Sequence, residues 1–339
     1  MIAGTAAALA NLMTGRFPEA RAAAGLVRTL SAQADRGSIS PVPTAFLSTA
    51  AVAYAHLCQG DLEDAAARAA EAGHLFTGMA HPSGRRWTLA LQLLATVQRG
   101  LIDEAGTLVT ALRTMPDLGQ IRCYDIDEVV GLAWYEFLTA DPAAAQDRLE
   151  QAAHGWLAEQ SAGLALLAAF ALFRLRFDDC AAALLDKIEV PADWPFGTTV
   201  AALIRARSPA DYITAGDAFR AYDMRLYAAE AYHLAATRTR PPGPKRSRAL
   251  HLAAALAQQC GADTPLLGRL NPATALTRRE EQIAALAAGG ASNREMAQHL
   301  GLSERTVENH LHRAFAKLGV TSRLALGPHV TAKRTDPSH

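Results

Sequence analysis

The stretch SNREMAQHLGLSERTVENHLHRAFAKLG, residues 292–319, predicts two helices joined by a short turn. Ser292 and Glu295 have the spacing of a capping box, in which each residue's side chain accepts a hydrogen bond from the other's backbone N–H. Gly301 can end the first helix, and Ser303 can cap the second. Apolar residues recur along the second helix, and its other face is polar; the apolar positions are Val307, Leu311, Phe315 and Leu318. A short helix, a brief link and a longer amphipathic helix are typical of a helix-turn-helix.

A further helix is predicted directly before this pair. It begins with a second capping box, Thr277-Arg-Arg-Glu280, and Gly289-Gly290 can end it. Its apolar stripe consists of Ile283, Leu286 and Ala287. Thr321 can cap a short fourth helix. A bundle this small is only marginally stable when its caps are wrong, so three caps in register indicate a folded domain.

Together these segments resemble the DNA-binding domain of LuxR-type bacterial regulators, also called NarL/FixJ- or GerE-type. The matching residues are Leu276-Thr-Arg-Arg-Glu280, Ala287-Ala-Gly289, Ser292-Asn-Arg-Glu-Met-Ala297, Leu300, Ser303, Arg305-Thr-Val-Glu-Asn-His310, Lys317-Leu-Gly-Val320 and Ser322-Arg323. The resemblance implies a DNA-binding domain at residues 276–330, with residues 303–318 as the recognition helix in the major groove.

The residues just before this domain, 252–265, are similar to the junction in the large ATP-binding subgroup of the same family. In that subgroup a helical-repeat region lies between a nucleoside-triphosphatase module and the DNA-binding domain. No G-x-x-x-x-G-K-[ST] loop occurs in this sequence, so we interpret the chain as a shortened relative without the ATPase. Gly327-Pro328 shortens the fourth helix, which commonly builds the dimer contact in this family. We therefore expect any homodimer to form through the N-terminal region.

The resemblance also implies roles for single residues. Three outward-facing residues occupy positions that enter the major groove: Glu308, Asn309 and His312. Asn309 can pair with adenine, and Glu308 can accept from N4 of cytosine or remain a solvated charge that repels phosphate. Phosphate contacts are expected from Arg305, Thr306, Arg313 and Lys317, and from Ser292, Asn293 and Arg294 at the start of the preceding helix. His310 lies beside the apolar stripe, so we expect it to be packed or bonded to the backbone.

The first two-thirds of the chain contains a weak internal repeat. Gly15, Gly60 and Gly100 are each followed, four and five residues later, by an acidic residue and an alanine. Ala140 and Arg176 continue the same phase more loosely, and successive markers are 45, 40, 40 and 36 residues apart. Each unit predicts a helix, a tight turn and a second helix. Such units are typical of TPR-like helical-repeat arrays; the alternative is an ordinary irregular helical domain.

Proline and glycine mark the domain boundaries. The segment from Arg238 to Arg248 contains Pro241-Pro-Gly-Pro244, five basic residues and no acid, so it is either a solvated connector or a loop that contacts phosphates. A helix predicted over 247–260 ends at Gly261. We divide the chain into a helical-repeat sensor or docking domain (1–260), a linker (261–275), the DNA-binding domain (276–330) and a flexible tail (331–339).

Composition favours an all-α protein, because half of the 339 residues are hydrophobic, alanine is abundant and only 6% are aromatic. Basic and acidic residues number 33 each, which excludes a histone-like polycation. Residues 271–339 nevertheless carry nine basic and six acidic side chains, which hints at an acidic partner. The longest internal apolar stretch, Ser161 to Phe173, is too short to cross a bilayer.

The cysteines match neither a disulfide framework nor a zinc site, because Cys58, Cys123, Cys180 and Cys260 are far apart. Buried thiols and a cytoplasmic location are therefore expected. No nucleophile motif, metal-ligand spacing or phosphate loop appears, so the sequence predicts no catalytic residue, no metal and no cofactor.

The sequence thus predicts a transcriptional regulator that binds double-stranded DNA. Its N-terminal region is expected to form a homodimer or to sense a protein or small-molecule effector, and no membrane partner is expected. The alternative is a helical-repeat adaptor between proteins, with a vestigial DNA-binding domain. The recognition helix at 303–318, which lacks proline and glycine, favours the regulator.

Overall fold

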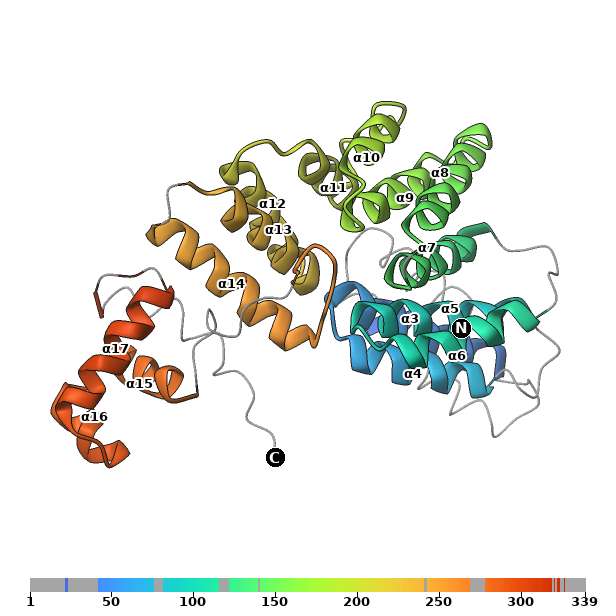
Figure 1. Cartoon of the computed structure of the whole chain (residues 1–339). Helices are drawn as coiled ribbons and strands as arrows, with labels where there is room; N and C mark the ends of the chain where they lie inside the picture. Colours follow the sequence, from blue (N-terminus) through green and yellow to red (C-terminus); the bar gives the residue numbers. More distant parts are fainter. Residues whose placement is uncertain are drawn as a thin grey trace.

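The computed structural model describes residues 22–23, 42–75, 82–115, 122–139, 141–240, 243–268, 278–318, 320, 322–323 and 326. Within these residues the regular structure is helical and no strand occurs, which confirms the all-α fold class. Figure 1 shows a curved array of helices followed by a small C-terminal group. The predicted features at Gly15, Thr277, Thr321 and 331–339 lie outside the described residues.

Helical hairpins stacked side by side make up the array. The helices are α3 (Val42–Gln59), α4 (Leu62–Leu75), α5 (Pro82–Gln98), α6 (Ile102–Thr114), α7 (Arg122–Leu138), α8 (Pro142–Ala158), α9 (Ala162–Arg174), α10 (Asp178–Leu185), α11 (Pro195–Arg205), α12 (Pro209–Ala221), α13 (Arg225–Arg238) and α14 (Pro244–Cys260). Each helix packs on the next along the chain, and α5, α7 and α9 also contact one another in order. The predicted helical array is therefore present (Figure 1).

The repeat markers in the sequence lie at turns inside the hairpins. Gly60, Gly100 and Arg176 have positive φ angles of 85°, 73° and 72°. In the first of these turns, Gly60 N bonds to Leu57 O at 3.2 Å, and Asp61 N bonds to His56 O at 2.9 Å. These two bonds satisfy the last carbonyls of α3 and require a left-handed residue between the helices. Glycine adopts that conformation readily because it lacks Cβ.

Other turns depart from the glycine pattern. Ala140, the fourth marker, lies outside the described residues. Gln160 and Asp223 have positive φ angles of 59° and 57°, and the repeat did not mark either of them. Asp223 is tied in place by its carboxylate, which accepts a hydrogen bond from Gln59 Nε2 at 2.7 Å. A turn that contains no glycine is difficult to recognise in a sequence.

The first hairpin of the array lies against the last helices. Asp61 forms an ion pair with Arg225 of α13, with 2.8 Å between Oδ1 and the guanidinium nitrogen. Gly60 lies so close to α14 that an added Cβ would be 2.7 Å from Cys260 Sγ. The turn between α3 and α4 therefore packs against both α13 and α14.

The first part of the expected linker is buried against the array. Asp263 N bonds to Gln98 O at the end of α5, at 2.8 Å. Leu266 and Leu267 are each only 1% exposed. Residues 261–268 thus contribute to the packing of the array. The remainder of the expected linker, 269–275, lies outside the described residues.

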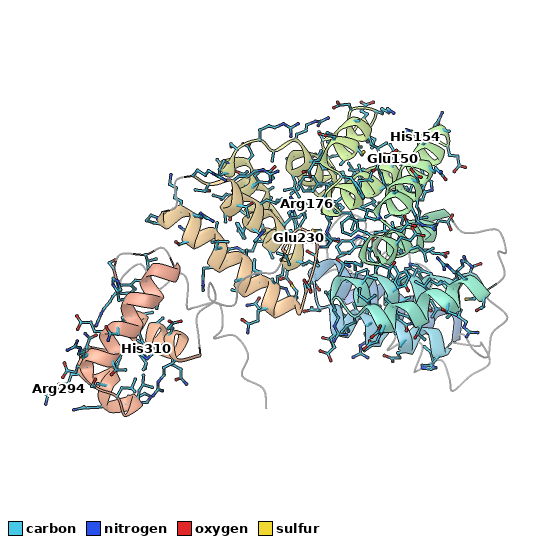
Figure 2. All side chains as sticks on the ribbon, viewed as in Figure 1. Glu150, His154, Arg176, Glu230, Arg294 and His310 are labelled. Carbon is cyan, nitrogen blue, oxygen red and sulfur yellow. The ribbon has the colours of Figure 1, made fainter. Side chains whose placement is uncertain are left out.

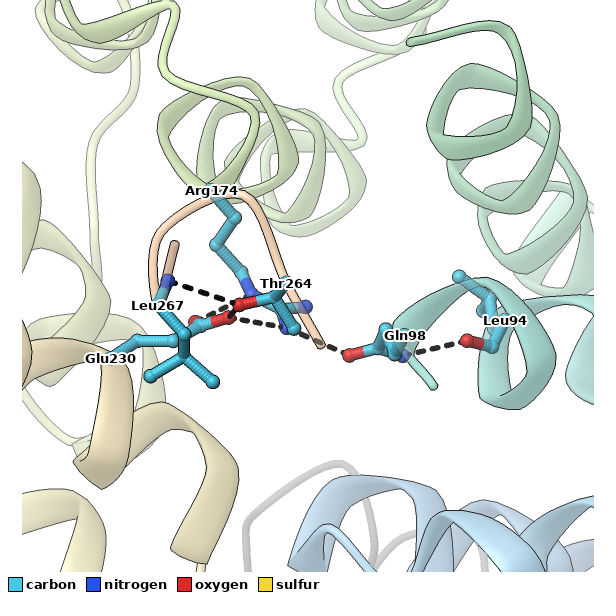
Figure 3. Close-up of polar contacts among 6 residues, drawn as sticks. All are labelled: Leu94, Gln98, Arg174, Glu230, Thr264 and Leu267. Carbon is cyan, nitrogen blue, oxygen red and sulfur yellow. Dashed lines mark hydrogen bonds and ion pairs between the residues drawn. The ribbon is translucent and has the colours of Figure 1, made fainter. Parts of the chain in front are cut away.

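A buried ion pair lies where this segment meets the array (Figure 3). Arg174 Nε donates to Glu230 Oε2 at 2.8 Å, and its terminal nitrogen donates to Gln98 Oε1 at 2.7 Å. Thr264 donates its hydroxyl proton to Glu230 Oε1 at 2.8 Å. Both charged side chains are almost fully buried, so this network satisfies groups that would otherwise be costly to remove from water.

Buried apolar side chains form two cores in the array. The larger core is built around Trp134, Phe170 and Phe219, and the smaller around Leu62 and Trp87. The apolar stretch 161–173 forms most of α9, which lies inside the larger core. No helix among the described residues is both long enough and apolar enough to cross a membrane.

The basic segment at 238–248 is helical at both of its ends. Helix α13 extends to Arg238, and α14 begins at Pro244 rather than at Ser247. Proline is favourable in the first turn of a helix because the N–H it lacks has no acceptor there. The connection between α13 and α14 is therefore shorter than the sequence pattern indicated.

Candidate nucleic-acid interface

The C-terminal domain consists of α15 (Arg278–Ala288), α16 (Asn293–Leu300) and α17 (Glu304–Leu318). Each helix begins directly after a predicted capping position, which confirms the three predicted helices. Their shared core consists of Ile283, Ala284, Ala287, Met296, Ala297, Val307, Leu311, Ala314 and Leu326. Leu326 lies beyond α17 and is fully buried, so the chain after the third helix helps to close the core.

The capping box at the start of α16 is confirmed. Ser292 Oγ accepts from Glu295 N at 3.2 Å, and Glu295 Oε2 accepts from Ser292 N at 2.7 Å. The backbone N–H and hydroxyl of Ser292 hold the pKa of the Glu295 carboxyl below its usual range. This carboxylate also complements the positive end of the helix dipole.

A tight turn sets the relative position of α16 and α17. Gly301 has φ 64°, and Leu302 N bonds back to Ala297 O at 2.9 Å. Ser303 Oγ accepts from Thr306 N at 3.1 Å and thereby caps α17. A left-handed residue followed at once by a helix cap allows the chain to turn within a few residues.

Two arginines to which we assigned no role from the sequence connect the helices. Arg279 of α15 donates to Leu300 O at 2.8 Å, at the end of α16. Arg323 donates to Ala291 O at 2.9 Å and also to the side-chain oxygen of Asn293, at the start of α16. Both arginines lie in segments that match the LuxR-type pattern, which was the signal available in the sequence.

The outer face of α17 carries the expected base-contacting residues. Glu308, Asn309 and His312 are exposed, as are Glu304 and Arg305. Positions 305, 308, 309 and 312 have helical i, i+3, i+4, i+7 spacing, so they lie on one face. The opposite face of α17, with Val307 and Leu311, is buried.

The expected phosphate-contacting residues of α17 lie in different surroundings. Arg305 is exposed in the first turn. Thr306 is half-buried, and its hydroxyl lies 2.7 Å from Ser303 Oγ. Arg313 and Lys317 are in the second half of α17, and their side chains lie outside the described residues.

At the start of α16, Arg294 is exposed and its side chain lies on the outside of the domain (Figure 2). The side chains of Ser292 and Asn293 are instead engaged within the protein, by Glu295 and Arg323 respectively. The backbone N–H groups of Asn293 and Arg294 come first in the helix, so helix geometry supplies them with no intrahelical acceptor. The backbone is thus the part of this segment best placed to bind an anion.

His310 is half-buried on α17 (Figure 2). Its Nδ1 is buried without a hydrogen-bond partner in the part of the chain that the structure describes. The ring is therefore packed beside the core, as expected from its place next to the apolar stripe.

No disulfide occurs among the described cysteines. Cys58, Cys180 and Cys260 are free, and the side chain of Cys123 lies outside the described residues. Within the described ranges, no three His, Cys, Asp or Glu side chains lie close enough together to hold a metal ion.

The C-terminal domain is similar to known proteins. Residues 274–327 match the family described as bacterial regulatory proteins, luxR family. The probable transcriptional regulatory protein SgaR of Hyphomicrobium methylovorum is 37% identical over 67 residues, which are 20% of this chain and 32% of SgaR. The probable HTH-type transcriptional regulator GfsR of Streptomyces halstedii is 41% identical over 63 residues, or 19% of this chain and 26% of GfsR.

The spore germination protein GerE of Bacillus subtilis is 42% identical over 48 residues, which are 14% of this chain and 65% of GerE. The match thus covers a third or less of SgaR and GfsR, and about two-thirds of the smaller GerE. No solved structure matches the chain significantly. The shared region coincides with α15 to α17 and with their caps. Residues 274–327 of this chain are therefore a helix-turn-helix domain of the luxR family of bacterial regulatory proteins.

Proposed function

We propose that this chain is a sequence-specific transcriptional regulator whose recognition helix, residues 303–318, enters the major groove of double-stranded DNA. The observation that carries the proposal is the exposed polar face of α17, held on a packed core inside a luxR-family domain. The relatives that share this domain are named as transcriptional regulators, which supports the same function.

Base recognition is assigned to the outer face of α17. Asn309 pairs with adenine through its amide, Glu308 accepts from cytosine N4, and His312 lies one turn further along the same face. All three side chains are exposed, so none has to leave the core in order to contact a base edge.

Phosphate contacts are assigned to residues on both sides of the turn. They are Arg305, Thr306, Arg313 and Lys317 on α17, and Ser292, Asn293 and Arg294 at the start of α16. The side chains of Ser292 and Asn293 are engaged within the protein, and so is the backbone N–H of Ser292. The backbone N–H groups of Asn293 and Arg294 therefore supply the contact at this helix start. Such contacts fix the register of the domain on DNA and do not depend on sequence.

The array is assigned the sensing, docking and oligomerisation roles. In this proposal residues 1–260 form the sensor or docking domain, 261–275 the connection and 276–330 the DNA-binding domain of a cytoplasmic protein. The segment 271–339 carries only a small excess of basic side chains, so one copy is expected to bind DNA weakly. A homodimer formed through the array would add the binding free energies of two half-sites.

Selection of bound sequences from a random DNA pool by the full chain tests the proposal. A defined motif is expected, and the double variant Asn309→Ala/His312→Ala should recover a degraded motif. A full chain that enriches no sequence, and shows no change in fluorescence anisotropy with any duplex at low salt, contradicts the DNA-binding function and favours the adaptor. Sedimentation of the full chain tests the dimer separately, and a strict monomer at tens of micromolar contradicts it.

A further inference from the structure

The two cores of the array meet at a seam of residues that are only partly buried. Tyr54 of α3, Val130 of α7 and Tyr227 of α13 each pack against both cores, yet all three remain half-buried. Removal from water nevertheless raises the pKa of both tyrosine hydroxyls well above the usual range. Because they pack against both cores and keep some accessible surface, these residues lie at the boundary between the two cores. We call this region, between Tyr54, Val130 and Tyr227, the inner seam.

An acidic side chain without a cationic partner adjoins the inner seam. Asp127 precedes Val130 by almost one turn of α7, and it is only 6% exposed. Its Oδ2 accepts from Trp87 Nε1 at 2.8 Å, and no ion pair to it occurs among the described residues. Its other neighbours are Tyr54, Cys58 and Tyr227, which are neutral at neutral pH. A buried carboxylate is costly unless a positive charge compensates it.

The same face of α7 carries an unused hydrogen-bond donor. Trp134 lies seven residues after Asp127, which places it two turns, or about 10 Å, further along the helix. It is completely buried, and its indole N–H has no acceptor in the described structure. The nearby Arg174 guanidinium lies 4.8 Å from the Trp134 ring, but it is already bonded to Glu230 and Gln98. A buried donor that remains unpaired destabilises the protein.

We propose that the inner seam binds a small organic amine, whose ammonium group pairs with Asp127 and whose hydrogen-bond acceptor meets the indole N–H of Trp134. This inference rests on the sensing role proposed above and specifies the chemical class of the effector. Tyr54 lines the seam with an aromatic ring, and such rings attract cations, whereas the ring of Tyr227 already has the Arg174 guanidinium 4.8 Å from its centroid. An organic anion is disfavoured, because Asp127 would repel it and the positive charge of Arg174 is already paired.

Burial strengthens the electrostatic part of this argument. Desolvation raises the pKa of Asp127 to about 7, although the hydrogen bond from Trp87 opposes the rise. An ammonium group stabilises the carboxylate, so binding of an amine should release a proton at mildly acidic pH. The affinity is therefore expected to decrease as the pH falls below 7, about tenfold per pH unit.

Calorimetric titration of the full chain at pH 8 with three matched probes tests the proposal. Tyramine carries an ammonium and a phenolic oxygen, phenethylamine lacks the oxygen, and 3-(4-hydroxyphenyl)propionate replaces the ammonium with a carboxylate. Tyramine should bind best, phenethylamine more weakly and the acid not at all. Absence of heat with both amines at millimolar concentration, or equal binding of the acid, overturns the proposal.

Two variants localise the binding to the seam. Asp127→Asn should weaken both amines by roughly tenfold or more, while an Asn oxygen can still accept from Trp87. Trp134→Phe should remove the advantage of tyramine over phenethylamine and leave phenethylamine binding unchanged. Asp147→Asn, which alters an exposed carboxylate on α8, serves as the control and should bind like the wild type.

Each variant tests the proposal on its own, so the test remains possible if the other variant fails to fold. Far-ultraviolet circular dichroism shows whether each variant is folded. Wild-type affinity for tyramine in folded Asp127→Asn overturns the proposal, and so does an unchanged advantage of tyramine in folded Trp134→Phe. Binding of DNA, measured by anisotropy without any amine, tests the proposed function independently. A result that contradicts amine binding at the inner seam can therefore be distinguished from one that contradicts DNA binding.

Discussion

Thr264 donates its hydroxyl proton to Glu230 at 2.8 Å and so anchors the segment that leads to the DNA-binding domain on a buried ion pair (Figure 3). Glu230 lies on α13 and its partner Arg174 on α9, while Gln98 of α5 bonds to the same guanidinium. Three helices and the segment 261–268 therefore meet at one polar network. A change in the packing of these helices would act directly on the segment that precedes residue 269.

Removal of one partner from this network should strongly destabilise the array. Glu230→Ala leaves the Arg174 guanidinium buried without its counter-ion, so we expect a loss of about 3–5 kcal/mol in the free energy of unfolding. The matched control is Glu71→Ala, which breaks the exposed pair with Arg68 and should cost less than about 1 kcal/mol. Urea unfolding followed by circular dichroism measures both, and equal losses would show that burial does not determine the cost.

The turn at Gly60 should not tolerate a side chain. Its φ of 85° is strained for alanine, and the new Cβ would approach Cys260 Sγ to 2.7 Å. We expect Gly60→Ala to lower stability by about 1–3 kcal/mol. Gly155→Ala, inside α8 with open space around the added Cβ, should instead raise stability by about 0.5–1 kcal/mol. Thermal unfolding that shifts in the same direction for both variants would contradict the role of the turn geometry.

The local features of the fold could be predicted from sequence, but the long-range contacts could not. The capping box of Ser292 and Glu295 depends on a spacing of three residues, so the sequence displays it directly. The contact between Arg174 and Glu230 joins residues 56 positions apart, and no local pattern marks either partner. For the same reason, the packing of residues 261–268 on the array was not foreseen.

The same distinction applies to the candidate interface. The exposed face of α17 follows from the apolar spacing on its other side, and the structure places Glu308, Asn309 and His312 on that face. The contact of Arg323 with the start of α16 could not be predicted, because it depends on how the chain folds back after α17. That fold-back engages the side chain of Asn293, which the sequence had suggested for phosphate binding.

The capping box of Ser292 and Glu295 predicts how the pKa of the Glu295 carboxyl responds to a substitution. Ser292→Ala removes the hydroxyl that donates to Glu295, so the pKa of this carboxyl should rise toward its ordinary value. Because the folded-state pKa is lowered, the carboxylate contributes to stability at neutral pH, and that contribution is lost as the pH falls through the lowered pKa. Titration of the Glu295 side chain by NMR in the two proteins measures the shift. An unchanged pKa in the variant would rule out the hydroxyl as a contributor.

Base reading by α17 predicts a change in sequence preference. Asn309→Ala should relax the preference at one base pair and cost about 1–3 kcal/mol on the best site, since the amide no longer pairs with its base. Affinity for unrelated duplexes should stay close to that of the wild type. Anisotropy titrations against a set of single-base variants of the selected site measure the effect. If all duplexes lose affinity equally, Asn309 contributes to binding without reading a base.

A phosphate contact predicts the opposite pattern, and Lys317 allows the two roles to be separated on one helix. Lys317 lies on α17, five residues after His312. We assign it a contact with a DNA phosphate rather than with a base. Each phosphate neutralised by a lysine releases a condensed counter-ion, so the slope of log affinity against log salt should become shallower by about one unit in Lys317→Ala. The variant should weaken specific and unrelated duplexes by the same factor, because phosphates carry no sequence information. Lys317→Arg, which keeps the charge, serves as the control and should retain the wild-type slope. If Lys317→Ala keeps that slope but loses preference at one base pair, Lys317 reads a base and belongs with Asn309.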